Sequence, residues 1–152
     1  MWGISDFELC QPVNPVYLSR MIYGLRFALI LLSLAVVVGA FGAHAIRDRI
    51  DEQLYNAWQT GVQYHFYHAL GMIAVTLIMY ADWMDPKKGK WVIRLLSAGI
   101  VLFSGSLYAM GLGSLSGLDL SWLGPVTPLG GLCFIAGWVM AAISVSLPVL
   151  RD

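Results

Sequence analysis

Four long apolar segments constrain this chain more than any other feature of its sequence. Each reaches the roughly 20 residues that a helix needs to cross a hydrocarbon core, and they cover about residues 21–45, 61–81, 91–112 and 127–150. No alternating strand pattern competes with them, and a backbone that crosses lipid must satisfy its own hydrogen bonds. The composition agrees, because 59% of the residues are hydrophobic and 12% are charged, about half the charge of a typical soluble domain. The sequence therefore predicts an all-α fold, a bundle of four transmembrane helices.

Outside these segments the chain offers a tail and one further helix. Residues 1–20 form an N-terminal tail containing Pro12 and Pro15, which either lies on the membrane surface or becomes ordered by docking on a partner. Residues 21–152 form the membrane domain. Between the first two spans, one helical face is apolar, which predicts a short amphipathic helix in the interface that bends directly into the second span. That face comprises Ile46, Ile50, Leu54, Ala57 and Trp58.

The stretch Ala43-His44-Ala45 is similar to a signal-peptidase site. The segment before it is too long for a typical signal peptide. We expect the first span to be retained.

The basic residues predict the orientation of the spans. With four crossings, both termini and the loop between the second and third spans share one side of the membrane. That side carries Arg20, Arg26, Lys87, Lys88, Lys90, Arg94 and Arg151, and the other side carries Arg47 and Arg49. The positive-inside rule therefore predicts that both termini are cytoplasmic, or face the matrix in an organelle.

Small residues recur at four-residue intervals in three of the spans. Such ridges allow helices to approach closely. They comprise Ala35, Gly39 and Ala43; Gly105, Ala109 and Gly113; and Cys133, Gly137 and Ala141. The two cysteines, Cys10 and Cys133, have no spacing that suggests a disulfide or a cysteine-based metal site.

The candidate functional stretch is Trp58–Leu70, which is polar and aromatic and holds two of the three histidines. At helical spacing His65 and His68 share a face. The predicted topology places both, together with His44, at the outer boundary of the bilayer. Imidazoles in a membrane helix are unusual enough to indicate a functional site.

Four ordered motifs between about residues 35 and 141 resemble one family, the domain-of-unknown-function-423 family of transmembrane-protein-256-like small membrane proteins. These motifs are Gly39-Ala40-Phe41-Gly42-Ala43-His44, Gln63-Tyr64-His65-Phe66-Tyr67-His68-Ala69, Leu102-Phe103-Ser104-Gly105-Ser106-Leu107-Tyr108 and Thr127-Pro128-Leu129-Gly130-Gly131 with Ala136-Gly137-Trp138. The resemblance implies a four-helix protein of bacterial inner membranes or mitochondria, and it supplies no activity. The tail is longer than the family's, and at His65 the family usually has another residue, often glutamine.

Three interpretations of the site remain open. In the first, the polar side chains form a structural cluster between helices, with His44, Gln63, Tyr64, Tyr67, His68, Ser104 and Tyr108 as members. In the second, His44, His65 and His68 bind a metal ion, or two of them ligate a haem. In the third, His68, Gln63 and the tyrosines hold a quinone or a lipid headgroup.

No nucleophile pattern, Walker loop or dinucleotide fingerprint is present, so an enzyme is disfavoured. The formal net charge of +0 gives no reason to expect nucleic-acid binding. The sequence favours a non-catalytic accessory or interaction subunit, associated in the bilayer with copies of itself or with other membrane-protein subunits. The alternative is a haem- or metal-binding redox component.

Overall fold

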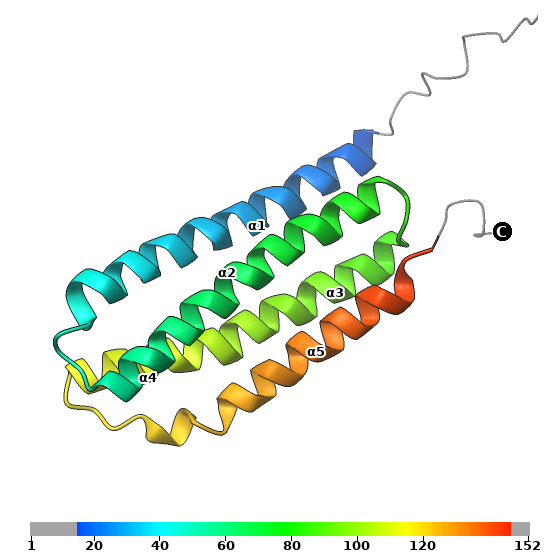
Figure 1. The fold of residues 1–152 in the computed structure, drawn as a ribbon. Helices are drawn as coiled ribbons and strands as arrows, with labels where there is room; N and C mark the ends of the chain where they lie inside the picture. Colours follow the sequence, from blue (N-terminus) through cyan, green and yellow to red (C-terminus); the bar gives the residue numbers. More distant parts are fainter. Residues whose placement is uncertain (1–14, 147–152) are drawn as a thin grey trace, which may run out of the picture.

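The helical spans run up and down across the molecule, as Figure 1 shows for the computed structural model. The structure describes residues 15–146. The elements are α1 (Pro15–Phe41), the π-helical turn η1 (Gly42–Ile46), α2 (Glu52–Tyr80), α3 (Pro86–Gly99), the π-helical turn η2 (Ile100–Ser104), α4 (Gly105–Leu115), the 3-10 turn η3 (Ser121–Leu123) and α5 (Val126–Ser144). Among the described residues four helical segments are long and apolar enough to cross a membrane. The prediction of an all-α membrane protein with four spans is thus confirmed.

Aspartate caps fix where two of the spans begin. The Asp51 carboxylate accepts a hydrogen bond from the Leu54 N–H at 2.9 Å, so α2 begins at Glu52. The Asp85 carboxylate accepts hydrogen bonds from the backbone N–H groups of Lys87 and Lys88 at 2.8 and 3.2 Å. Those N–H groups, Lys88 first, lower the pKa of Asp85 because they favour its charged form.

The early start of α2 corrects one expectation from the sequence. The amphipathic segment predicted between the first two spans is not a separate helix, because Glu52–Trp58 is the first part of α2 itself. Its polar side chains lower the hydropathy but do not interrupt the helix. As a result, His65 and His68 lie near the middle of α2 and not at its mouth.

The chain ends also differ from expectation. α1 begins at Pro15, within the predicted tail, where a proline at the first helical position costs no hydrogen bond. α5 ends at Ser144, since Val145 has extended backbone. Val145 forms an isolated antiparallel bridge with Met84, which ties the end of α5 to the turn before α3. The predicted helical residues 147–150, and the tail before Pro15, lie outside the described residues.

α2 occupies the centre of the bundle. α1 packs against α2, α3 packs against α5, and α2 also contacts α3, η2 and α4. The buried core consists of Ala28, Met72, Val75, Met84, Val92, Leu96, Ile100, Phe134 and Ala141. α1 therefore has one packed face and a broad exposed apolar face.

The π turn η2 lies in the middle of the third span, and Trp58 packs against the helix that follows it. A Cβ at Gly111 of α4 would lie 2.8 Å from the Trp58 ring. The same indole packs on Gly42, and its Nε1–H donates to the Val38 carbonyl at 3.3 Å. Trp58 thus connects the end of α1 to α4, and it is 2% exposed.

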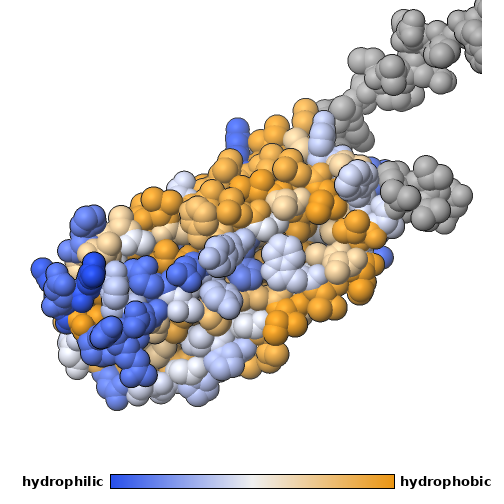
Figure 2. Space-filling view, in the orientation of Figure 1, coloured by the Kyte–Doolittle hydropathy of each residue, from blue (hydrophilic) through white to orange (hydrophobic). Residues whose placement is uncertain are grey.

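The surface separates into polar and apolar regions. Figure 2 shows hydrophilic residues gathered at the end of the bundle where α1 turns into α2, and hydrophobic residues over most of α1. Paler and hydrophilic residues continue from that end along the middle of the same face.

Candidate functional site

The candidate site is a cluster of rings at the middle of the bundle, where α2, η2 and α5 meet. It consists of Tyr64 and His68 from α2, Phe103 from η2, and Phe134 and Trp138 from α5. We call these five residues the central ring cluster. It brings together one of the predicted motifs on α2 with aromatic residues from two later motifs.

His68 is the polar centre of this cluster. Its imidazole stacks on the Phe134 ring with centroids 3.4 Å apart and planes at 12°. Its Nδ1 lies 2.6 Å from the Tyr64 carbonyl oxygen. Because a carbonyl oxygen only accepts hydrogen bonds, Nδ1 must carry the proton, and a neutral ring then has its lone pair on Nε2. The backbone of α2 therefore fixes both the tautomer and the orientation of His68.

Tyr64 covers the outer side of the cluster. Its ring stacks on Phe103, with centroids 4.6 Å apart, and lies 5.8 Å from the His68 ring. Trp138 packs on the opposite side against Gly71, where an added Cβ would lie 2.6 Å from the indole. Tyr64 is 39% and Trp138 41% exposed, so the cluster reaches the surface of the bundle.

His65 belongs to a different environment. Its Nδ1 faces the Tyr108 hydroxyl of α4 at 3.4 Å, and the backbone of Leu31 on α1 also interacts with the ring. The buried Nε2 has no partner within hydrogen-bonding geometry among the described residues. His65 and His68 therefore contact different helices although they are three residues apart.

His44 lies exposed on η1, apart from the other two histidines. The neighbouring Gly42 packs on Trp58, which precedes His68 by ten residues on α2, a separation of about 15 Å at about 1.5 Å per residue. Within residues 15–146 no three His, Cys, Asp or Glu side chains are placed to hold one metal ion. The structure thus does not assemble the metal site predicted from His44, His65 and His68, because α2 carries two of them deep into the bundle.

The remaining polar candidates divide into buried and exposed groups. Ser104 is buried on η2, and its Oγ has no hydrogen-bond partner among the described residues. The Tyr108 hydroxyl interacts with it but lies outside hydrogen-bonding geometry. Gln63 and Tyr67 are exposed on α2, and the Tyr67 ring lies at the edge of the central ring cluster, with its centroid 6.5 Å from that of Tyr64.

The small residues of the predicted ridges pack in part. Ala35 is buried and Gly39 faces Val62, but Ala43 is exposed and Gly42 takes the packed position. A four-residue repeat drifts around a helix of 3.6 residues per turn, whereas Ala35 and Gly42, seven apart, stay on one face. In α5, Gly137 packs on α3 and Ala141 is buried, while Cys133 is half-buried.

The third span departs further from its predicted ridge. Gly105 and Ala109 are half-buried, and Gly113 packs against the loop that follows α4. The positions of this span that contact α2 are instead Leu107 and Tyr108, which pack on Gly61, and Gly111, which packs on Trp58.

The chain is similar in sequence to a family of known proteins. Residues 38–131 match the family model described as "Protein of unknown function (DUF423)". The chain belongs to the DUF423 family. The matched range includes α2, η2 and α4, so it contains the α2 and η2 parts of the central ring cluster, whereas Phe134 and Trp138 follow it.

Several relatives are similar over most of their length. The UPF0382 membrane protein YwdK of Bacillus subtilis is 45% identical over 115 residues, 73% of this chain and 85% of YwdK. The UPF0382 membrane protein SH2409 of Staphylococcus haemolyticus is 39% identical, over 73% of this chain and 84% of its own length. The UPF0382 membrane protein C1782.12c of Schizosaccharomyces pombe is 37% identical, over 69% of this chain and 86% of its own length. No solved structure matches the chain significantly. This DUF423 protein is thus a membrane protein related to bacterial and yeast membrane proteins.

Tyr64 and His68 were predicted from the sequence, but the other three rings of the central ring cluster were not. Phe103, Phe134 and Trp138 are aromatic residues in apolar spans, where such residues give no signal of their own. Two of them lay within the resembling motifs, Phe103 in one and Trp138 in another. A motif that recurs in a family was therefore the available clue, and it did not specify which rings would meet.

Proposed function

We propose that this DUF423 protein is a non-catalytic accessory or interaction subunit of a membrane assembly. Its partner is a second copy of the chain or another membrane-protein subunit. The observation that carries this proposal is a row of uncharged polar side chains exposed along α2. They are Asn56, Thr60, Gln63 and Tyr67, which we call the α2 polar stripe.

The stripe occupies one face of α2, because its members recur at intervals of three and four residues. Asn56, Gln63 and Tyr67 are exposed and Thr60 is half-buried, and Tyr67 reaches 60% exposure. Farther along α2 the same face carries Leu70 and Leu77, both exposed and apolar.

Part of the stripe lies at the depth of the hydrocarbon core. About 20 helical residues cross that core, and twenty positions counted back from the aromatic Tyr80 reach Gly61. Gln63 and Tyr67 fall inside this interval. The Gln63 amide makes no hydrogen bond within the described residues, so lipid alone would leave its donors and acceptor unsatisfied.

A neighbouring membrane helix would satisfy these groups. Asparagine, threonine, glutamine and tyrosine side chains each donate and accept, so the stripe is complementary to a copy of itself. Two copies inserted with the same orientation present the same groups at the same depth, as a two-fold axis along the membrane normal requires. Hydrogen bonds of this kind contribute about 0.6 kcal/mol each between membrane helices.

The redox alternative finds less support in the geometry. A neutral His68 with Nδ1 bonded to a carbonyl has the arrangement common to metal-ligating histidines. However, His65 faces other helices and His44 lies on η1, before the start of α2, so the described residues bring one imidazole to the central ring cluster. The described histidines thus favour the structural interpretation of His68.

The proposal includes a location. The basic residues favour a bacterial inner membrane or a mitochondrial membrane with both termini on the cytoplasmic or matrix side. The start of α1 and the end of α5 lie at the same end of the bundle, which supports this arrangement.

Photocrosslinking in native membranes tests the proposal. A photoreactive benzophenone amino acid placed at Tyr67 should give a discrete protein adduct, whose mass distinguishes a second copy from another subunit. The matched control is Val37 on the lipid-facing side of α1, which is 62% exposed and lies at a similar depth, since Gly39 faces Val62. We expect no discrete protein adduct from Val37. Equal adducts from both positions, or none from Tyr67, would contradict the proposal.

A further inference from the structure

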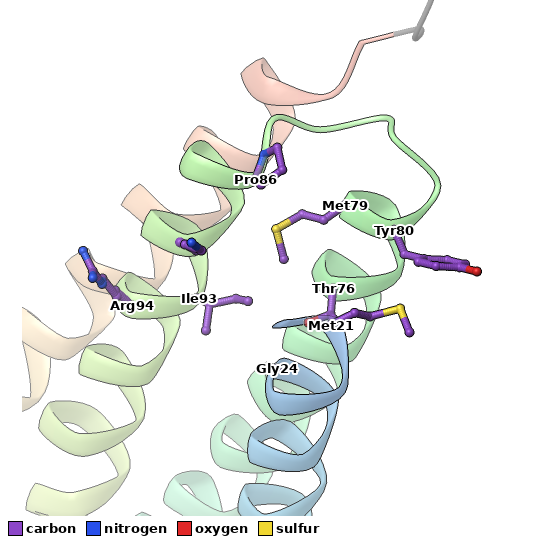
Figure 3. Close-up of a pocket in the computed structure, with 9 residues that line it drawn as sticks. Met21, Gly24, Thr76, Met79, Tyr80, Pro86, Ile93 and Arg94 are labelled. Atoms are coloured by element: carbon purple, nitrogen blue, oxygen red, sulfur yellow. The ribbon is translucent and has the colours of Figure 1, made fainter. Parts of the chain in front are cut away.

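A separate cavity of about 320 Å³ opens at the end of the bundle where α1 begins, α2 ends and α3 begins. Figure 3 shows its walls, with Met79 and Ile93 projecting into the space between α2 and α3 and Gly24 on α1 beside Thr76. α1 packs against α2 and not substantially against α3, so the side of the cavity between α1 and α3 is left uncovered. None of the residues that line the cavity belongs to the central ring cluster.

The lining combines apolar surface with two cations. Lys90 and Arg94 lie four residues apart on α3 and therefore share a face. The residues that line the cavity include no aspartate or glutamate. The Arg94 guanidinium lies 4.9 Å from the centroid of the Trp91 ring, a cation–π contact, and Figure 3 shows it on the side of α3 away from Met79, at the edge of the cavity.

The depth of the cavity matches the boundary of a bilayer. Tyr80, Trp83 and Trp91 are 46%, 50% and 54% exposed at this end, and such aromatic residues gather at headgroup level. The two cations are thus at the level of lipid phosphates. Ile93 lies at the level of Arg94, and Gly24 lies further into the bundle, where an acyl chain would pass.

We propose that this cavity binds an anionic phospholipid. Lys90 and Arg94 contact the phosphate and headgroup, and one acyl chain runs along the apolar wall between α1 and α3. Basic pockets between membrane helices are suited to anionic headgroups, and the lateral opening toward lipid favours an amphiphile over a soluble anion. This site is independent of the α2 polar stripe, so either proposal can fail without the other.

Native mass spectrometry of the detergent-purified full chain tests the site. We expect one phosphatidylglycerol molecule to remain bound, with phosphatidylcholine bound more weakly. The variant Lys90→Gln with Arg94→Gln should weaken phosphatidylglycerol binding by about 25-fold, since each basic residue near a membrane surface contributes about fivefold. The matched control removes the same charge from Lys87 and Lys88, which are exposed at the same end and do not line the cavity.

The binding of phosphatidylglycerol to the variants distinguishes a built site from general surface attraction. The proposal is supported if phosphatidylglycerol stays bound to two variants. They are the Lys87→Gln, Lys88→Gln control and a charge-conserving Lys90→Arg, Arg94→Lys variant. Equal losses in the two neutralised variants would show general surface attraction and overturn it, as would equal binding of both lipids. Displacement of the lipid by inorganic phosphate would show a soluble anion site and also overturn it. If the neutralised variant does not fold, the preference of the unaltered chain between the two lipids decides.

Discussion

Two buried serines in the third span differ in their hydrogen bonding. Ser106 Oγ lies within hydrogen-bonding distance of two partners. It donates to the Phe103 carbonyl oxygen at 2.9 Å, and it lies 2.7 Å from Thr127 Oγ1 of α5, where either hydroxyl can be the donor. Ser104 Oγ, two residues earlier, has no such partner among the described residues. A buried hydroxyl contributes to stability when it is paired and costs free energy when it is not.

This difference predicts opposite effects of the same substitution. Ser106→Ala should lower the free energy of unfolding by about 0.6–1.7 kcal/mol, the range for hydrogen bonds between membrane helices. Ser104→Ala should leave stability unchanged or raise it, because it removes an unpaired buried oxygen. Unfolding in mixed detergent micelles, followed by circular dichroism, measures both. A loss on Ser104→Ala as large as that on Ser106→Ala would contradict the prediction.

The polar residues of the candidate site could be predicted from the sequence, whereas the aromatic residues that pack against them could not. His68 and Tyr64 could be selected because polar side chains are rare and costly inside apolar spans. Their partners could not, because Phe134 and Trp138 lie more than sixty positions later and look like any other apolar residue in a span. The burial of Ser104 without a partner follows from the packing of helices alone and leaves no trace in the sequence.

Among the helices, the contact of α5 with η2 depends on one of two adjacent glycines. A Cβ at Gly130 would lie 2.8 Å from the Phe103 Cα, so the two backbones are in direct contact. A Cβ at Gly131 would meet a Phe103 ring atom at 3.9 Å, an ordinary distance. The pair offers a test in which composition, helix and depth are all matched.

Gly130→Ala should destabilise the protein by about 1–3 kcal/mol, because α5 must move away from the third span. Gly131→Ala should be neutral or stabilise by up to about 1 kcal/mol, since alanine is the better helix former. The same unfolding measurement distinguishes them. Equal effects of the two substitutions would show that α5 does not approach Phe103 as closely as described.

The existence of the spans could be predicted from the sequence, but their boundaries were less accurate. Hydropathy identifies the four spans because lipid selects apolar side chains over about 20 residues. It placed the start of the second span near Gly61, since the residues before it are polar, although Asp51 already marks a helix start by its capping side chain. With that start, His65 and His68 were expected at the mouth of the helix, whereas they lie near the middle of α2. The cavity lined by Lys90 and Arg94 could not be predicted from the sequence, because its walls come from three separate spans.

For the whole molecule, the charge asymmetry predicts how the bundle sits in the membrane. Seven basic residues lie on the side of the termini, against Arg47 and Arg49 on the other. In a bacterial host, a fluorescent protein fused after Asp152 should therefore fluoresce, and alkaline phosphatase fused there should be inactive. Insertion of the phosphatase into the turn after Arg49 serves as the control and should be active. The reverse pattern would show the opposite orientation.

The wide turn at η2 also sets the alignment of the whole bundle. The buried positions of the third span run from Val92 through Ser104 to Gly111, nineteen residues for five turns, where a regular helix uses about eighteen. The π turn accommodates the additional residue. A chain shortened by one residue there would rotate everything that follows by about 100°. Gly111 would swing out from under Trp58, and the end of α1 would lose its anchor to the other half of the protein.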